Sequence, residues 1–193
     1  MFEYFKAAKR FEIQALERLG EDCLPPPLPP EERPPFSLAL KHKAEKEGLA
    51  VIAEYKRASP SQGDIALEVT PAEAAKAYAM AGAAAISVLT EKSKFKGRLS
   101  FIESARAGLS GSSRLSSSVP PILRKDFIFH PLQIRATAAT RASALLLIVK
   151  LCPSADVLAS LINQAGSYGL ECVVEVLDEA DLMLARQAGA EII

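Results

Sequence analysis

From residue 50 onward the chain repeats one pattern: a short apolar run, a loop, and an amphipathic segment rich in alanine and leucine. The apolar runs cover residues 51–56, 84–90, 121–126, 145–150 and 172–177, and a sixth begins at 190–193. The amphipathic segments predict helices at residues 71–81, 99–107, 131–139, 154–168 and 179–188. Nearly continuous apolar strands that alternate with helices are typical of right-handed βαβ units. The repeat therefore predicts an α/β fold with a parallel sheet.

The N-terminal part of the chain does not follow this repeat. Residues 2–19 carry apolar side chains at helical spacing and predict an amphipathic helix. Repeated prolines in residues 24–35 exclude the interior of a helix or sheet and favour an extended connector. A short helix then follows, with Ser37 as its expected N-cap. We therefore predict a helical extension with a proline-rich connector at residues 1–48, and the repeating units at residues 49–193.

Composition excludes several classes of protein. The 193 residues have a formal net charge of zero, so nothing electrostatic favours nucleic acid or an anionic membrane as a partner. The cysteines Cys23, Cys152 and Cys172 are widely spaced, which argues against a disulfide framework or a zinc site. No apolar run approaches about 18 residues, and the N-terminus lacks the apolar region of a signal peptide. We expect a cytoplasmic protein without a metal, in which Cys172 is a buried thiol.

Charged side chains stand at the end of each of the first five apolar runs. They are Glu54 and Lys56, Glu91, Lys125 and Asp126, Lys150, and Glu175. In a (β/α) barrel, strand ends converge on one face, where active sites lie. In an open doubly wound sheet they would meet at a switch point instead. No glycine-rich nucleotide motif follows the first strand, and the charge pattern favours the barrel, with the doubly wound sheet as the alternative.

The first strand and the loop after it hold several polar side chains close together. Glu54 and Lys56 are two residues apart, so on a strand they point to the same face. Burying such a pair costs several kcal/mol unless the charges are paired or used. Ser59 and Ser61 follow in a loop that also contains proline and glycine. The hydroxyl groups and backbone of such a loop suit the binding of an anion. The structural alternative is a solvated strand end followed by a turn.

Lys125 and Glu175 are the candidates for acid–base chemistry. Glu175 stands between apolar residues, so burial should raise its pKa and a nearby lysine should lower it, which suits a general base. Lys125 could donate a proton or stabilise an oxyanion. The alternative is a structural ion pair between the two inside a barrel. We expect Lys150 to pair with an acid at its strand end, and His130 to lie in a loop or at a helix start.

Five segments together closely resemble the indole-3-glycerol phosphate synthases. They are IAEYKRASPSQG at 52–63, ISVLTE with FKG between 86 and 97, LRKDFI at 123–128, LLLIVK at 145–150 and VEV at 174–176. They follow the order and spacing of that family across residues 36–193. The resemblance implies a (β/α)8 TIM barrel, here an incomplete barrel of units 1–5 and the start of strand 6, after an N-terminal helical extension.

The resemblance also implies a function. Enzymes of this family act in tryptophan biosynthesis and close the indole ring of 1-(o-carboxyphenylamino)-1-deoxyribulose 5-phosphate, losing CO2 and water. This chemistry implies a carbon–carbon lyase, a small phosphorylated substrate, and no metal or cofactor. The implied catalytic residues are Lys125 as general acid, Glu175 as general base, and Glu54. The implied substrate-binding residues are Lys56 near the carboxylate and phosphate, Ser59 at the phosphate, and Phe95 and Phe127 as aromatic walls.

The sequence departs from the family at its C-terminal end. It stops as the sixth strand begins, whereas a full barrel takes about 250 residues. The family's Asn-Arg segment after strand 6, the serine of strand 7 and the Gly-Ser phosphate loop of strand 8 are absent. We therefore expect open sheet edges and exposed apolar helix faces, and little activity from this chain alone. A missing C-terminal segment or self-association would account for these edges.

Two further functions stay open. One is a truncated, inactive relative that acts only as a fragment or an assembly module. The other is a different phosphate-binding barrel enzyme, such as a phosphoribosyl isomerase, whose chemistry would not need Lys125 and Glu175 together.

Overall fold

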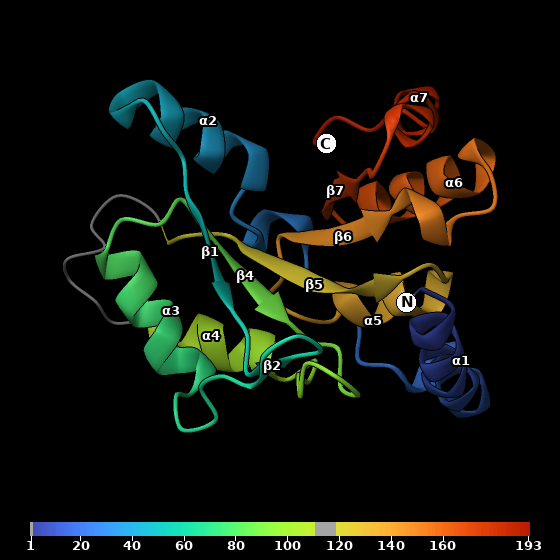
Figure 1. Cartoon of the computed structure of the whole chain (residues 1–193), viewed down its shortest axis with the longest axis horizontal. Coiled ribbons are helices and arrows are strands. Elements are labelled where there is room, and N and C mark those ends of the chain that lie inside the picture. The colour runs from blue at the N-terminus through green and yellow to red at the C-terminus, as the bar shows by residue number, and fades with distance from the viewer. Residues whose placement is uncertain (1, 111–118) are drawn as a thin grey trace.

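The sheet is parallel, and its strands stand side by side in the order in which they occur in the chain (Figure 1). The computed structural model describes residues 2–110 and 119–193. The strands are β1 (Ile52–Tyr55), β4 (Ala85–Leu89), β5 (Ile122–Ile128), β6 (Ala144–Ile148) and β7 (Glu171–Glu175). A doubly wound sheet would reverse its strand order partway, and this one does not. The predicted α/β fold with a parallel sheet is confirmed.

A helix follows each strand and returns the chain to the start of the next. The helices are α1 (Phe2–Leu19), α2 (Phe36–Glu47), α3 (Pro71–Met80), α4 (Phe101–Leu109), α5 (Pro131–Ala138), α6 (Ala155–Ser167) and α7 (Glu179–Gln187). The predicted helices match these to within two residues at each end. The serine-rich segment at residues 110–118, for which the sequence predicts a mobile loop, lies outside the described residues except for its first position.

The main hydrophobic core lies between the sheet and the helices α3 to α7. Every second strand residue points outward into it, because a strand sends successive side chains to opposite faces. The buried strand residues include Ile86, Val88, Ile122, Leu145 and Leu147, and the helices contribute Ala75, Ile102, Ile134, Leu158 and Ala185. A single cluster therefore joins the sheet to all five helices, so these helices cover one face only, as in a barrel.

The helix α2 closes the inner face of the sheet at the N-terminal ends of the strands (Figure 1). Phe36, which is 0% exposed, packs against Ala85, Leu123 and Ala144. These three residues stand on neighbouring strands and point to the side opposite the main core. Phe36 therefore acts as a plug beneath the space that the strands surround.

The start of α2 corrects one sequence prediction. The helix begins at Phe36, after Pro35, so Ser37 is not its N-cap and that prediction is wrong. The carboxylate of Glu171 instead accepts hydrogen bonds from the backbone N–H groups of Phe36 and Ser37. A negative charge there also suits the positive end of the helix dipole. A residue on β7 thus holds the extension against the sheet.

The connector between α1 and α2 is tied to the barrel by one arginine. The buried guanidinium of Arg33 donates hydrogen bonds to the carbonyl oxygens of Ala138, Thr140, Ala142 and Tyr168. Most of the connector is extended, as predicted. It also contains a short 3-10 turn at Pro30–Glu32, which the prediction missed because proline is tolerated in the first turn of a helix.

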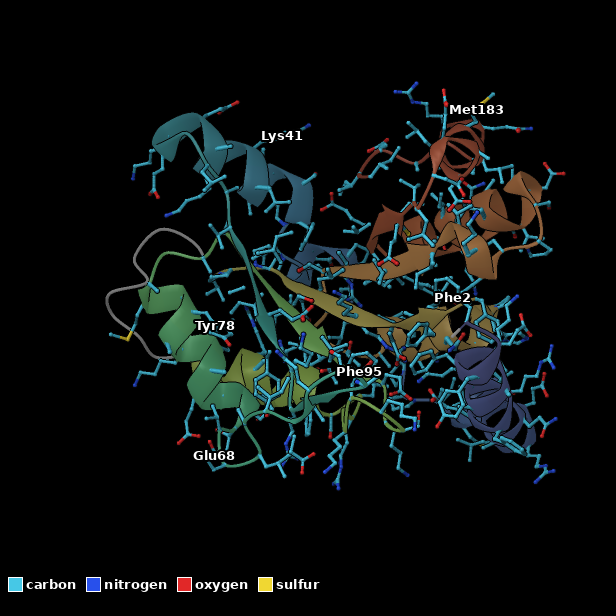
Figure 2. All side chains as sticks on the ribbon, in the orientation of Figure 1. Phe2, Lys41, Glu68, Tyr78, Phe95 and Met183 are labelled. Atoms are coloured by element: carbon cyan, nitrogen blue, oxygen red, sulfur yellow. The ribbon has the colours of Figure 1, made fainter. Side chains whose placement is uncertain are left out.

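Both edges of the sheet are open in the described residues. The Val174 N–H donates to the Ile192 carbonyl at 2.9 Å, so a sixth strand begins where the sequence predicts it. On the other side β1 pairs only with β4. Apolar side chains are exposed on the helices beside both edges, Met80 on α3 and Met183 on α7, and Met183 points away from the sheet (Figure 2). The fold is that of an incomplete (β/α) barrel.

We expect the Phe36 plug to contribute strongly to stability. Replacing Phe36 with alanine should lower the free energy of unfolding by about 3–5 kcal/mol, because it leaves a cavity beneath the strands. Urea denaturation followed by circular dichroism measures this change. The matched control is Phe11→Ala on α1, whose side chain is 75% exposed and whose loss should change little. Equal effects of the two substitutions would contradict the assigned role of Phe36.

Candidate functional site

Three charged side chains meet above the plug, on the inner face of the sheet. The Glu54 carboxylate on β1 forms ion pairs with the Lys125 ammonium of β5 at 2.7 Å and with the Lys56 ammonium at 3.0 Å. All three side chains are partly exposed. The sequence predicted Glu54 and Lys56 on one face, and their contact confirms this. The group holds two cations and one anion, so it presents a surplus positive charge to an incoming ligand.

The charge state of Glu54 follows from this arrangement. Burial acts to raise the pKa of Glu54, but the hydrogen bonds from Lys125 and Lys56 outweigh it and hold the pKa below its ordinary value. Glu54 is therefore a carboxylate at neutral pH. Its ion pairs hold both ammonium groups on the inner face.

Phe95 and Phe127, the predicted aromatic walls, lie near each other with ring centroids 6.4 Å apart. A third ring, Phe5 of α1, stacks on Phe127 at 3.8 Å with an interplanar angle of 10° and lies 6.0 Å from Phe95. The sequence predicted α1 but gave no sign that Phe5 would reach this place. Only its position on the apolar stripe of the helix marks it as buried.

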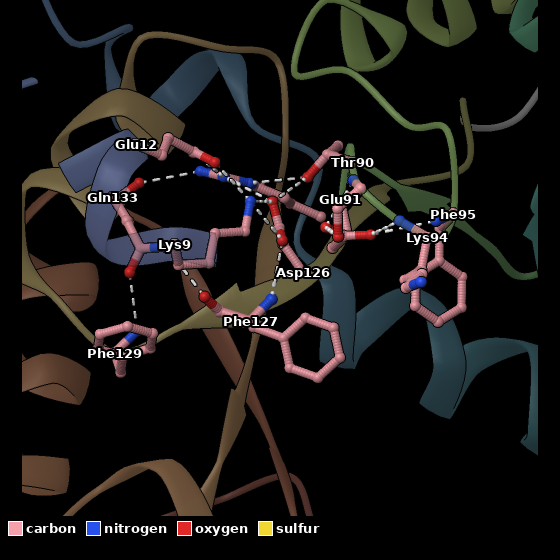
Figure 3. Close-up of polar contacts among 12 residues, drawn as sticks. Lys9, Glu12, Thr90, Glu91, Lys94, Phe95, Asp126, Phe127, Phe129 and Gln133 are labelled. Carbon is pink, nitrogen blue, oxygen red and sulfur yellow. Dashed lines mark hydrogen bonds and ion pairs between the residues drawn. The ribbon is translucent and has the colours of Figure 1, made fainter. Parts of the chain in front are cut away.

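The loop that carries Phe95 is shaped by Glu91. The buried Glu91 carboxylate accepts hydrogen bonds from the backbone N–H groups of Ser93, Lys94 and Phe95, and from the Ser93 hydroxyl (Figure 3). Its oxygens are thus occupied by the loop itself. Glu91, one of the charged strand ends, holds the loop of Phe95 in place and does not join the Glu54 group.

Ser59 lies in a small hairpin after β1 that the sequence did not predict. The strands β2 (Ala58–Ser59) and β3 (Gly63–Asp64) pair antiparallel. The Ser59 hydroxyl accepts a hydrogen bond from the Gln62 N–H at 3.1 Å and lies 3.3 Å from the Ser61 hydroxyl. The hairpin gives this loop a regular backbone pairing at Ala58–Asp64 and Ser59–Gly63. The role of Ser59 at a phosphate stays a prediction.

Glu175 stands at the end of β7, level with Ile148 of β6. It is partly buried, and its carboxylate makes no hydrogen bond or ion pair with the described residues. The proposed structural pair of Lys125 with Glu175 is not what the structure shows, since Lys125 pairs with Glu54. A carboxylate without a partner is available to accept a proton, so the expected role of Glu175 stays a prediction.

Two other charged strand ends have partners outside the Glu54 group. Asp126 is buried on the opposite side of β5 from Lys125, because adjacent strand residues alternate. Lys150 pairs with Asp178 and Asp181, each at 2.8 Å, which confirms the ion pair with an acid expected for it. His130 is the N-cap of α5, a helix start as predicted. Glu54, Lys56 and Lys125 thus meet in one group, while Asp126 and Lys150 pair with other residues.

A cavity of about 1020 Å³ lies between α1 and the loop after β4, on the outer side of β5. Its lining includes Lys9, Glu12, Thr90, Arg124 and Asp126. These side chains are bonded mainly to one another, so they offer a ligand few free groups. The inner face, with a partly exposed ammonium group at Lys125, is the stronger candidate for chemistry.

Two general features complete the description. Among residues 2–110 and 119–193, no three histidine, cysteine, aspartate or glutamate side chains are grouped in a way that could hold a metal ion. Over the same residues, no helix combines the length and apolarity needed to cross a bilayer.

Burial raises the pKa of the Cys172 thiol to about 12, as suits the partly buried, unreactive cysteine found there.

The comparisons with known proteins agree with one another. A family model described as indole-3-glycerol phosphate synthase matches residues 8–193. A curated protein of that name from Mycolicibacterium gilvum is 44% identical over 162 residues, which is 84% of this chain and 56% of the relative. One from Geobacillus kaustophilus is 40% identical over 176 residues, 91% of this chain and 61% of the relative. The chain thus spans little more than half the length of these relatives.

The low pKa of Glu54 predicts a pH dependence of stability. In the folded protein the pKa of Glu54 lies below its value in the unfolded chain, which is near 4.5. The Glu54 carboxylate therefore stabilises the fold at pH values above 4.5. This stabilisation is lost as the pH falls through the folded pKa. Between about pH 6 and about pH 3, Glu54→Gln should therefore lose less thermal stability than the unmodified chain. Thermal midpoints at both pH values measure this. The exposed Glu68→Gln is the control, and equal losses in all three proteins would contradict the prediction.

Proposed function

The chain belongs to the indole-3-glycerol phosphate synthase family, and from this premise we propose that its protein closes an indole ring. The proposed substrate is 1-(o-carboxyphenylamino)-1-deoxyribulose 5-phosphate, which loses CO2 and water. The observation that carries the proposal is the 2.7 Å contact between Lys125 and Glu54 on the inner face, beside Phe127. It supplies a proton donor next to an aromatic wall.

Lys125 is the proposed general acid. As the aromatic ring carbon attacks the substrate ketone, the ketone oxygen gains negative charge and takes a proton from the Lys125 ammonium. Decarboxylation then leaves the ring with its bonding electrons. Glu175, the proposed general base, then accepts a proton from the carbon that joins the nitrogen to the former ketone carbon. The hydroxyl group leaves as water with a second proton from Lys125, which solvent has reprotonated. The ion pair with Glu54 directs Lys125 inward.

The surplus positive charge fits the substrate. The substrate carries a carboxylate and a phosphate, and Lys56 is the proposed contact for these anions, with Ser59 at the phosphate. Phe95 and Phe127 are the proposed walls for the anthranilate ring. Phe5 occupies space against Phe127 in this structure, so a ring that enters between the walls must share or displace it.

We expect the 193-residue chain by itself to turn over little or no substrate. Its inner face is open beside β1 and beside Ile192, so water reaches the group that must act as an acid. Product formation can be followed by indole fluorescence, because the chain contains no tryptophan. Turnover equal to that of a curated relative would contradict this expectation.

The roles of Lys125 and Glu175 can be tested in a chain extended with the C-terminal part of the Geobacillus kaustophilus relative. Lys125→Ala and Glu175→Gln should each lower kcat by about 100-fold or more, because each removes one partner of general acid–base catalysis. Lys41→Ala, on the exposed face of α2 (Figure 2), is the control and should leave kcat unchanged. An extended chain that folds but needs neither residue would favour a different barrel enzyme, such as a phosphoribosyl isomerase.

A further inference from the structure

The stretch of β5 that carries Lys125 and Phe127 is irregular. Its pairing with β6 is in register at Leu123 and Arg124, and then shifts before Ile128 pairs with Leu147. Such a bulge leaves the residues within it without regular ladder bonds on that side. The directions of the Lys125 and Phe127 side chains therefore depend on the other contacts that hold the backbone of the bulge.

Side chains hold the bulge at Phe127. The Phe127 N–H donates to Oδ1 of Asp126 at 2.8 Å, and the Phe127 carbonyl accepts from Nε2 of Gln133 at 2.9 Å. Gln133 is fully buried and also accepts from the Phe129 N–H at 2.9 Å (Figure 3). Both backbone groups of Phe127 are thus satisfied by side chains, so these side chains set its conformation.

Asp126 is itself held by three other groups. Its carboxylate accepts from the Thr90 hydroxyl at 2.7 Å and from Nη2 of Arg124 at 2.9 Å, and it receives Nζ of Lys9 at 2.8 Å (Figure 3). Burial acts to raise the pKa of Asp126, but Arg124 and Lys9 outweigh it and hold the pKa below its usual value. Asp126 is therefore a fixed charge.

Lys9 comes from a distant part of the chain. It lies on α1, its side chain is only 3% exposed, and it also pairs with Glu12 at 2.7 Å. The same helix stacks Phe5 on Phe127. The helix α1 therefore contacts the bulge twice, through a buried charge at Asp126 and through an aromatic ring at Phe127. Burying a lysine costs free energy unless its charge is paired, and the Lys9 charge is paired with Asp126 at the bulge.

We propose that Lys9 is a positioning residue: through Asp126 it fixes the β5 bulge and thereby the directions of Lys125 and Phe127. It makes no contact with the reacting groups itself. The inference rests on the proposed function for what Lys125 and Phe127 do, but not for how they are held. Lys9 thus links the N-terminal extension to the inner face of the barrel.

The test compares Lys9→Met with Lys9→Arg in the 193-residue chain. Amide hydrogen exchange at Phe127, measured by NMR, should become about tenfold faster in Lys9→Met, because Asp126 loses a group that orients it. Lys9→Arg, which keeps the charge, should restore most of the protection. Arg10→Met removes an exposed charge from the same helix and should leave exchange at Phe127 unchanged. Exchange at Ile86, in the core, shows whether a variant merely unfolds more often.

A second measurement asks whether the site depends on this link. In the extended chain, binding of indole-3-glycerol phosphate, followed by the fluorescence of this ligand, should weaken about tenfold in Lys9→Met and recover in Lys9→Arg. Unchanged exchange and unchanged binding in Lys9→Met would overturn the inference, as would equal acceleration at Phe127 and Ile86. If Lys9→Met does not fold, Lys9→Gln, which keeps a hydrogen-bond donor, takes its place with the same criteria. Failure of the extended chain without substitutions to bind counts against the proposed function, while exchange in the 193-residue chain still decides the role of Lys9.

Discussion

The buried carboxylate of Asp126 is the interaction on which the arrangement of the site depends. A strand sends adjacent side chains to opposite faces, so β5 turns Lys125 and Phe127 inward and Arg124 and Asp126 outward. The outward pair would be costly to bury alone, but together with Lys9 it forms a compact group of opposite charges. The charged group on the outer face therefore fixes the directions of Lys125 and Phe127, because all four residues lie on the same stretch of backbone.

Much of the fold could be predicted because its signals are local. An apolar run of five or six residues and a stripe at helical spacing each depend on a few neighbours in the chain. The start of α2 shows where this stops. Ser37 has the right side chain for an N-cap, yet Glu171, 134 residues away, takes that place. A cap supplied by another strand leaves no trace in the sequence around the helix.

In the site, too, contacts between residues close in the sequence could be predicted, and contacts between distant residues could not. Glu54 and Lys56 meet because two residues on one strand share a face, which is a local rule. The partner of Lys125 was not predictable in this way. Glu54 and Glu175 both stand at strand ends of the same sheet, and only the curvature of the sheet and the reach of the side chains select Glu54. Lys9 was missed because a lone lysine on an amphipathic helix is most often a solvated one.

The N-terminal extension explains how an open sheet can hold a defined site. A closed barrel stabilises its strands by pairing the last with the first, which the described residues do not do. The extension instead contacts the sheet and its helices at several places, among them Phe36 below the inner face, Arg33 at the end of α5, and Lys9 at the β5 bulge. Each contact joins a residue before β1 to a strand or helix far along the chain. The contact between Glu54 and Lys125 spans only β1, β4 and β5, so it can form on this scaffold whether or not the later strands are paired.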